Sequence, residues 1–355
     1  MTKSARRSQN ALFLFAVTVI GGLAVFFGSP PGSVGLAAGQ MPLRLAYFPN
    51  ITHAPAIVGE ERGEFRRALG AHVAIVSTQF NAGPEEMEAL LANAVDIGFV
   101  GPGPALNTYL KTGGHALKII SGACSGGAAL VARDGANIRS IRDLDGKRVA
   151  VPLIGGTQDV SLRHFLKAEG LGPVEQGGSV RILPIKNPDI LALFRRNQLD
   201  AAWVPEPWAS RLVHEAHASL VVDERDLWPN GRFTTTVVVV RQAYLKEHPA
   251  EVRRFLRGLI RTINWLDAHG DEGRRIVNAQ LKKLTGKELP EPVMSDAWSR
   301  VTFTTDPDSN SIDAFLRAEQ EAGYLPQTQM RTADLLDLQP LEAERQAAGR
   351  LAYRR

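Results

Sequence analysis

Short apolar segments alternate with amphipathic segments along most of the chain. The pattern predicts strands at residues 43–48, 73–80, 96–100, 117–121, 148–151, 180–183 and 234–241. Between and after them it predicts helices at residues 56–69, 85–93, 105–111, 157–169, 249–268, 272–284, 295–301 and 313–322. Strands that alternate with helices are typical of parallel sheets flanked by helices, so the predicted fold class is α/β.

One helix–strand segment occurs twice in the sequence, 104 positions apart. Residues 84–100 read PEEMEALLANAVDIGFV, and residues 188–204 read PDILALFRRNQLDAAWV. The strands that precede these segments align at the same offset, which pairs Arg44 with Arg148. Chance similarity between α/β segments is the alternative, but a gapless match of this length favours a duplicated lobe. Two such lobes would face each other across a cleft, and clefts between domains bind small ligands.

The pattern divides the chain into four parts. Residues 1–39 form a leader and linker, residues 42–132 with 234–330 form the first lobe, and residues 133–233 form the second. Residues 331–355 form a C-terminal helical tail, and we expect the charged part beyond Leu341 to be solvated or loosely docked. Crossings between the lobes near residues 130 and 235 would act as a hinge.

The leader has the order of a secretory signal peptide. Basic residues at positions 3, 6 and 7 precede an uncharged apolar run at 11–27, and small residues allow cleavage after Ala37 or Gly39. We therefore expect an exported protein, in the periplasm or at the outer face of the cytoplasmic membrane. The alternative is that the apolar run is retained as an anchor, since its length is nearly enough to span a bilayer.

Composition and motifs exclude several functions. The formal net charge of +4 is modest, and no basic stripe with interleaved aromatic residues marks a nucleic-acid interface. Cys124 is the single cysteine, which excludes an internal disulfide and a cysteine zinc site. The sequence contains no HExxH, GxSxG or Walker A motif, so we expect no metal, no cofactor and no catalytic group.

Loops at the carboxyl ends of the first-lobe strands supply candidate ligand groups, because ligands of open α/β sheets bind there. These groups are Asn50, Thr52, His53, Gly101, Pro102, Ser125, Gly126 and Gly127. The structural alternatives are a capped helix start for residues 50–53, a tight turn for residues 101–102 and a flexible hinge for residues 125–127. A proline at a helix start leaves the other free N–H groups of the first turn available to an anion.

The second lobe adds candidates at matching positions. Thr157 and Gln158 open a helix after a glycine pair, and the repeat places Thr157 opposite His53. Two helix N-termini would then point into the cleft and suit an oxyanion such as a sulfonate, nitrate or carboxylate. Glu206 and Trp208 follow the repeated strand. Glu206 would receive a cationic or hydroxyl group of the ligand, and Trp208 would form an apolar wall.

Several segments resemble the substrate-binding proteins of nitrate/sulfonate/taurine-type ABC importers. They are LRLAYFPNITHAPA, NAGPEEMEALLANAVDIGFVGPGPA, SGACSGGAALVAR, RDLDGKRVAVPLIGGTQ and LDAAWVPEPWA, between about Leu43 and Pro326. The resemblance implies a two-lobed type II periplasmic-binding-protein fold with mostly parallel sheets. It also implies a monomer that closes on a small organic anion and delivers it to a membrane permease without chemistry. An aliphatic sulfonate or taurine-like compound is the expected ligand, with nitrate and bicarbonate left open.

Two other functions stay open at this point. Proteins that bind thiamine-pyrimidine precursors or synthesise the pyrimidine resemble the same fold, and the enzymes would need a lysine that carries pyridoxal phosphate. The leader and the lack of a clear cofactor lysine argue against that function. The second alternative is a membrane-tethered ligand sensor, in which residues 11–27 stay as an anchor.

Overall fold

The computed structural model of the protein describes residues 39–326 and 331–353. The leader predicted for residues 1–39 lies outside the described residues except for its last position, so it stays a prediction. Across the two described ranges, no helix combines the length and the apolar character that crossing a membrane requires.

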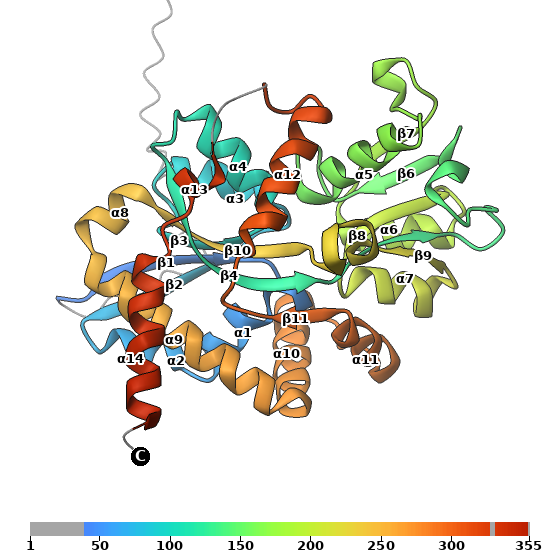
Figure 1. Ribbon diagram of the computed structural model, residues 1–355. Coiled ribbons are helices and arrows are strands. Elements are labelled where there is room, and N and C mark those ends of the chain that lie inside the picture. The colour runs from blue at the N-terminus through green and yellow to red at the C-terminus, as the bar shows by residue number, and fades with distance from the viewer. Residues whose placement is uncertain (1–38, 327–330, 354–355) are drawn as a thin grey trace, which may run out of the picture. The chain divides into compact units, whose positions relative to one another are not determined.

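The first lobe is built on a six-stranded sheet with the strand order β11–β4–β10–β3–β1–β2 (Figure 1). Its strands are β1 (Met41–Tyr47), β2 (Val73–Gln79), β3 (Ile97–Val100), β4 (Leu117–Gly126), β10 (Thr234–Arg241) and β11 (Val301–Phe303). Strand β1 is parallel to β2 and β3, whereas β10 runs antiparallel to β3 and β4. The central β10 is buried along almost its whole length, which explains its run of β-branched residues.

Helices cover both faces of this sheet because side chains alternate along each strand. Val237 and Val239 of β10 join the buried cluster under α3 (Gly83–Leu91) and α4 (Pro102–Lys111). Val238 and Val240 join the opposite cluster, under α1 (Ala54–Glu61), α2 (Glu64–Leu69), α9 (Pro249–Ala268) and α10 (Gly270–Thr285). The helix predicted at 56–69 is therefore two helices, separated where Gly63 takes a positive φ of 67°.

The second lobe is built on a five-stranded sheet with the order β7–β6–β8–β5–β9. Its strands are β5 (Ala128–Ala132), β6 (Arg148–Val151), β7 (Arg181–Pro184), β8 (Ala201–Pro205) and β9 (Ser219–Asp223). The flanking helices are α5 (Thr157–Ala168), α6 (Asn187–Arg195) and α7 (Trp208–Ala216). Strand β5 runs antiparallel to both of its neighbours. Both sheets are thus mixed rather than mostly parallel, because β5 and β10 follow crossings between the lobes and run opposite to the duplicated strands.

The first crossing lies at Gly126 and Gly127, earlier than the predicted lobe boundary after residue 132. Both glycines have positive φ values, 76° and 77°. A Cβ on Gly126 would come within 2.5 Å of the Arg300 carbonyl oxygen, so the close backbone approach requires glycine here. The sequence pattern predicted β5 as a connection, but its pairing with β8 and β9 makes it part of the second lobe.

The duplicated segments form the same local structure in both lobes. The Arg44 backbone N–H and Nε donate to Asp96 Oδ2 at 3.0 and 2.7 Å. Arg148 makes the same two bonds to Asp200 Oδ2, both at 2.9 Å. The registers of the parallel strands and the left-handed asparagine after each helix also match at the offset of the repeat. The structure therefore confirms the predicted duplication.

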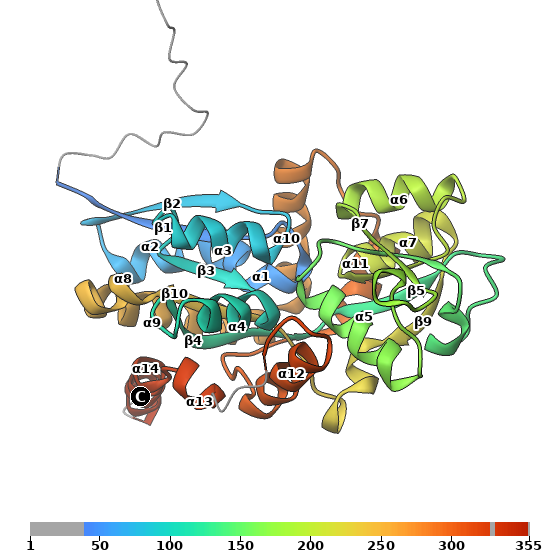
Figure 2. The ribbon, with the colours of Figure 1, turned by 90° about the horizontal axis from the view of Figure 1, so that it is seen from above.

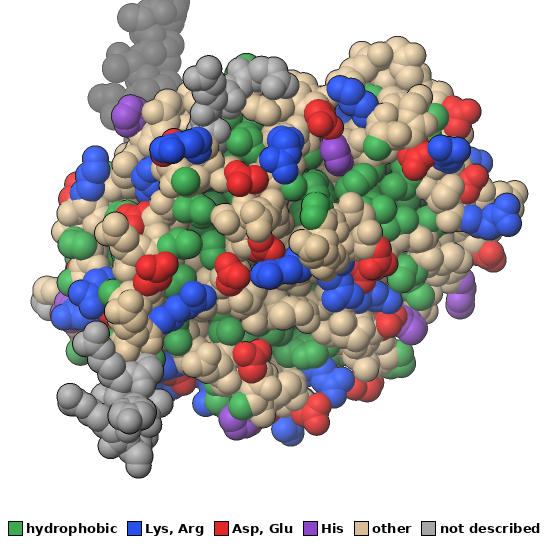
Figure 3. All heavy atoms as spheres, viewed as in Figure 1, with side chains coloured by type: hydrophobic (Ala, Val, Ile, Leu, Met, Phe, Trp, Pro, Cys, Tyr) green, Lys and Arg blue, Asp and Glu red, His purple; other side chains and the backbone are tan. Residues whose placement is uncertain are grey.

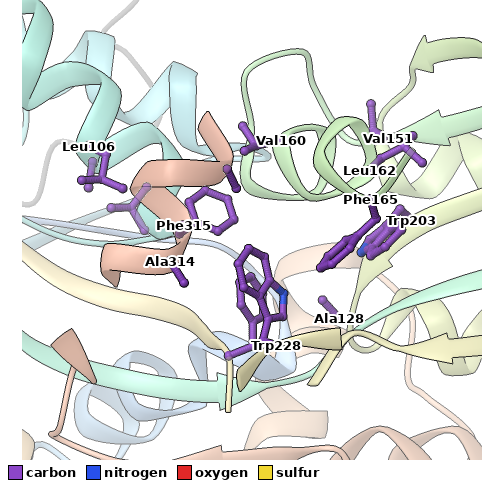
Figure 4. Close-up of a cluster of buried hydrophobic side chains, with 14 of the residues drawn as sticks. Leu106, Ala128, Val151, Val160, Leu162, Phe165, Trp203, Trp228, Ala314 and Phe315 are labelled. Carbon is purple, nitrogen blue, oxygen red and sulfur yellow. The ribbon is translucent and has the colours of Figure 1, made fainter. Parts of the chain in front are cut away.

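The predicted boundaries placed every helix after β10 on the first lobe. In the structure, two of these helices pack elsewhere. Helix α11 (Glu291–Ser299) packs on α7 of the second lobe, and α12 (Ser309–Glu321) lies between α4 and α5 (Figures 1 and 2). Phe315 of α12 faces Trp228, which precedes β10, with ring centroids 5.6 Å apart (Figure 4). Phe165 and Trp203 of the second lobe continue this aromatic cluster. The C-terminal third of the chain thus contacts both lobes.

The C-terminal tail is firmly docked rather than solvated. Helix α14 (Gln339–Tyr353) packs on α9, and α13 (Thr332–Leu335) lies on the way to it. Leu341 is fully buried, and Glu344 accepts hydrogen bonds from Arg253 Nε at 3.0 Å and Arg257 Nε at 2.8 Å. These contacts hold the tail on the first lobe.

Candidate functional site

A cavity of about 40 Å³ lies between the lobes at the carboxyl ends of their strands. A water molecule needs roughly 10–15 Å³ on the same measure, so the cavity admits a group of a few atoms. The first lobe lines it with Phe48, Asn50, Thr52, His53, Asn81, Ala82, Gly83, Gly101, Pro104, Thr235 and Thr236. The second lobe lines it with Pro152, Leu153, Gly156, Thr157, Gln158, Asn187 and Pro205.

Helices α3, α4, α5 and α6 all begin at this cavity. Their starts contribute Gly83, Gly101, Thr157 and Asn187 to the lining. In the described part of the chain, no N-cap side chain of these four helices bonds the first-turn N–H groups. Such N–H groups have no partner inside the helix and carry the positive end of its dipole. Pro84, Pro102 and Pro188 have no N–H, so the uncapped donors at the cavity are the first turn of α5 and the remaining N–H groups at the other starts, such as that of Gly83.

The starts of α4 and α5 touch across the cleft. A Cβ built on Gly101 would lie 2.1 Å from Thr157 Oγ1, which is too close for any nonbonded pair. Glycine is therefore required for the helix starts to approach this closely. Among the described residues the Thr157 hydroxyl has no hydrogen-bond partner, so it is available to a ligand in the cavity.

His53 presents a neutral hydrogen-bond donor. Its Nδ1 accepts a hydrogen bond from the Phe48 backbone N–H at 3.2 Å, so the ring proton resides on Nε2. Burial lowers the pKa of His53 to about 3, because the imidazolium ion would lose its hydration. The ring is therefore uncharged at physiological pH, and its Nε2–H group is left as a hydrogen-bond donor.

Two buried polar atoms of the cavity have no hydrogen-bond partner among the residues that the structure describes. These are Asn187 Oδ1 at the start of α6 and Thr236 Oγ1 in β10. Buried polar groups in folded proteins are nearly always hydrogen-bonded, so unpaired groups that line a cavity indicate a place for a ligand or solvent.

The cavity lining contains no charged side chain in the part of the chain that the structure describes. An anion would be held by helix dipoles and neutral donors, and a cation would find no carboxylate. On the face drawn in Figure 3, acidic and basic side chains are interspersed rather than gathered into a patch of one sign. That surface is unlike the basic stripe of a nucleic-acid interface.

The structure brings together six of the residues that the sequence indicated, namely Asn50, Thr52, His53, Gly101, Thr157 and Gln158. The others lie outside the lining. Pro102 begins α4 beside the cavity without lining it, and Gly126 and Gly127 form the crossing. Ser125 belongs to β4, where its Oγ donates to the Phe233 carbonyl at 3.1 Å.

Glu206 was expected to receive a ligand group, but its side chain is engaged inside the protein. It is fully buried and accepts hydrogen bonds at 3.0 Å from both the N–H and the Oγ of Ser210. Arg300 Nη1 donates to the same carboxylate at 2.8 Å. Burial raises the pKa of Glu206, and Arg300 opposes that shift. Glu206 therefore links α7 to the end of α11 instead of lining the cavity.

Trp208 lies next to the cavity rather than in it. Its Nε1 donates to Asn50 Oδ1 at 3.0 Å, which joins the two lobes directly. The Arg211 guanidinium lies 4.6 Å from the centroid of its ring. Trp208 lines a second, neighbouring groove that shares Asn50 with the cavity.

Sequence reasoning missed several lining residues, chiefly Asn81, Asn187, Thr235 and Thr236. Asn187 was detectable, because the 104-residue offset pairs it with Gly83 at the start of the equivalent helix. Thr235 and Thr236 were predicted only as part of a strand. No sequence signal showed that the beginning of that strand borders the cleft.

Comparison with known proteins identifies the family. Residues 37–281 match the model of the NMT1-like family, which is well over half of the chain, so the protein belongs to this family. It is 30% identical over 206 residues to the taurine-binding periplasmic protein of Escherichia coli K12, a match that covers 58% of this chain and 61% of that protein. It is 26% identical to a putative aliphatic sulfonates-binding protein of Bacillus subtilis 168, over 76% of each chain. The matched region is thus under two thirds of the length of the taurine-binding protein.

Solved structures confirm the fold. The alkanesulfonate-binding protein SsuA from Xanthomonas axonopodis pv. citri, bound to MOPS, has a TM-score of 0.70 at 19% identity and covers 85% of this chain and 100% of its own. The periplasmic nitrate-binding protein NrtA from Synechocystis PCC 6803 has a TM-score of 0.72 at 16% identity and covers 87% and 89%. These similarities confirm the predicted two-lobed periplasmic-binding-protein fold.

Proposed function

We propose that this NMT1-like protein is the substrate-binding component of an ABC importer and binds a small organic oxyanion without altering it. The observation that carries the proposal is the set of uncapped helix starts from both lobes at one uncharged cavity. Helix N-termini are suited to oxyanions because their N–H groups donate and their dipoles favour negative charge. The names of the taurine- and sulfonate-binding relatives support the same ligand class.

The oxyanion would bridge the lobes. Its oxygens accept hydrogen bonds from the first-turn N–H groups of α5 and the Thr157 hydroxyl in the second lobe, and from His53 Nε2 in the first lobe. These donors come from different lobes, so the ligand interacts better with the closed arrangement than with an open one. Binding therefore shifts the population towards closure, and the closed monomer is the form that a membrane permease would recognise.

Export follows from the same proposal. A binding component of an importer works outside the cytoplasm, and the secretory pattern of residues 1–39 supplies the route. The Escherichia coli relative is named as periplasmic. Mass spectrometry of the protein purified from its natural host would test this step, because retention of residues 11–27 would indicate an anchored protein instead.

The lining residues support binding rather than covalent chemistry. In the described part of the chain, the cavity presents no lysine, cysteine or carboxylate side chain. Cys124 is buried in the opposite cluster of the first lobe, and burial raises the pKa of its thiol. A thiol in such surroundings is a poor nucleophile.

The test is calorimetric titration of the full chain with methanesulfonate, ethanesulfonate, nitrate and bicarbonate. The Thr157→Val variant removes a hydroxyl donor of the cavity, and Thr108→Val makes the same change in α4 outside the lining. Loss of a hydrogen bond to a charged ligand costs about 1.5–3 kcal/mol, so Thr157→Val should weaken binding about tenfold or more. Thr108→Val should leave the affinity unchanged. If no oxyanion binds the native chain, the proposed function is wrong.

A further inference from the structure

We infer that the free edge of β4 is a self-association site for a second copy of this chain, and that the C-terminal tail keeps the protein monomeric by covering that edge. Strand β4 has β11 as its outer neighbour, but β11 pairs with residues 124–126 of β4. In the described part of the chain, no strand pairs with residues 117–121 on this side. This role of the tail is independent of the ligand that the cavity binds.

The tail lies along the free edge of β4. Leu336 forms a parallel bridge with Ile119, and the Asp337 N–H donates to the Ile119 carbonyl at 2.9 Å. Lys118 Nζ and Tyr109 Oη both donate to the Asp334 carbonyl, Tyr109 at 2.9 Å. Figures 1 and 2 show α13 and α14 beside β4 on this side of the sheet. The tail therefore takes the place that a further strand would occupy.

The tail also closes both hydrophobic layers of the first lobe. Leu335 is fully buried in the cluster under α3 and α4, whereas Leu341 is fully buried in the cluster on the opposite face. The segment between these two leucines thus passes around the edge of the sheet from one face to the other. If the tail lifted off, Ile119 and Ile120, which belong to opposite clusters, would lie at an open edge.

An uncovered edge of this composition would pair with another strand. Residues 117–121 read LKIIS, and Lys118 is the single charged residue of β4. Natural edge strands avoid such pairing through charged residues, proline or a covering segment, and here the covering segment is the tail. A second copy presents the same edge, so two β4 strands can form an antiparallel pair about a two-fold axis. The partner that fits the edge is therefore another molecule of this chain.

The test is analytical ultracentrifugation of the full chain over a series of protein concentrations. The native chain should keep the monomer mass throughout. Leu335→Asp combined with Leu341→Asp puts a charge into each hydrophobic layer and so releases the tail, and the mass should then rise towards that of a dimer. Leu91→Asp combined with Leu220→Asp makes the same change at leucines that are 49% and 41% exposed, and should stay monomeric. Circular dichroism verifies that each variant is folded.

A synthetic peptide of residues 331–353 tests where the two copies meet. In excess it should return the released variant to the monomer mass, because it competes for the same edge, whereas a scrambled peptide should not. A dimer that persists with the peptide would place the contact elsewhere and overturn the inference.

A milder variant decides the matter if the double variant does not fold. Leu336→Asp alters the partly buried residue that bridges Ile119 and leaves Leu335 and Leu341 in place. It should associate at higher concentrations than the double variant. If every folded tail variant keeps the monomer mass at all concentrations, the tail does not guard this edge. These masses are measured without ligand, so that result would leave the proposed function standing.

Discussion

Thr157 Oγ1 lies 2.1 Å from the position that a Cβ on Gly101 would occupy. Gly101 precedes α4 in the first lobe, and Thr157 begins α5 in the second. Their contact brings two helix N-termini to the same cavity wall, so the separation of this pair reports how far the lobes have closed.

Gly101→Ala should prevent full closure. The added methyl group would overlap Thr157 Oγ1, so we expect anion affinity to fall about tenfold or more, as for the loss of one charged hydrogen bond. Calorimetric titration measures the change. In a Thr157→Ala background the same substitution should have a smaller effect, because the Oγ1 atom at 2.1 Å is gone and only the tight contact with the Thr157 Cβ, at 3.1 Å, remains. Equal losses in both backgrounds would show that the contact does not limit closure.

Trp208→Phe should weaken ligand binding without unfolding the protein. Phenylalanine keeps an aromatic ring in the groove but loses the N–H that bonds Asn50 across the lobes. A neutral hydrogen bond contributes about 1 kcal/mol, so we expect a several-fold rise in Kd and little change in Tm. Trp265→Phe, on α9 away from the cleft, is the matched control and should leave Kd unaltered.

Anion affinity should be nearly independent of pH between about 5.5 and 8. The pKa of His53 is lowered to about 3, so the imidazole stays neutral through this range, and sulfonates do not titrate there. An ordinary histidine would become protonated below about pH 6.5 and attract the anion more strongly. Titrations at both ends of the range decide the matter, and a tenfold gain at the acidic end would mean that His53 becomes charged in the complex.

The same pKa shift predicts the stability of the free protein at acid pH. Because the pKa of His53 is lowered in the folded state, its contribution to the free energy of unfolding is complete above the unfolded pKa of about 6.5. It is lost as the pH falls towards 3, since the unfolded chain binds the proton first. Tm should therefore decline in that window, and His53→Gln should reduce the decline.

Glu206→Ala should destabilise the fold rather than remove a ligand contact. The substitution leaves the Arg300 guanidinium, only 12% exposed, without its buried carboxylate. Breaking such a pair costs about 3–5 kcal/mol, which thermal or denaturant unfolding detects. Glu288→Ala removes an exposed partner of Lys282 and should cost less than about 1 kcal/mol. A stable Glu206→Ala protein with lost anion binding would restore Glu206 to the site.

The sequence predicted the two-lobed fold because the relevant signals are local and repeated. Arg44 with Asp96 and Arg148 with Asp200 make equivalent ion pairs at one offset, and the pattern of each copy follows from its own residues. The loops at the strand ends were recognisable for the same reason. Thr157 and His53, paired by the repeat, both line the cavity.

What the sequence did not predict depends on long-range packing. Glu206 at a strand end has the pattern of a ligand group, and only the approach of Arg300, 94 residues later, occupies its carboxylate. The direction of β5 is set by its pairing with β8, not by its composition. Helices α11 and α12 were assigned to the first lobe because amphipathicity shows that a face is buried but not what covers it.

The uncharged cavity also determines how an anion arrives. A pocket lined by fixed charges attracts its ligand over roughly a Debye length, about 8–10 Å at moderate salt, and its capture rate falls as salt is added. Helix starts and neutral donors act only at contact distance. The association rate is therefore governed by diffusion into the cleft and by the motion of the lobes, and it should stay nearly constant as the ionic strength of the surroundings changes.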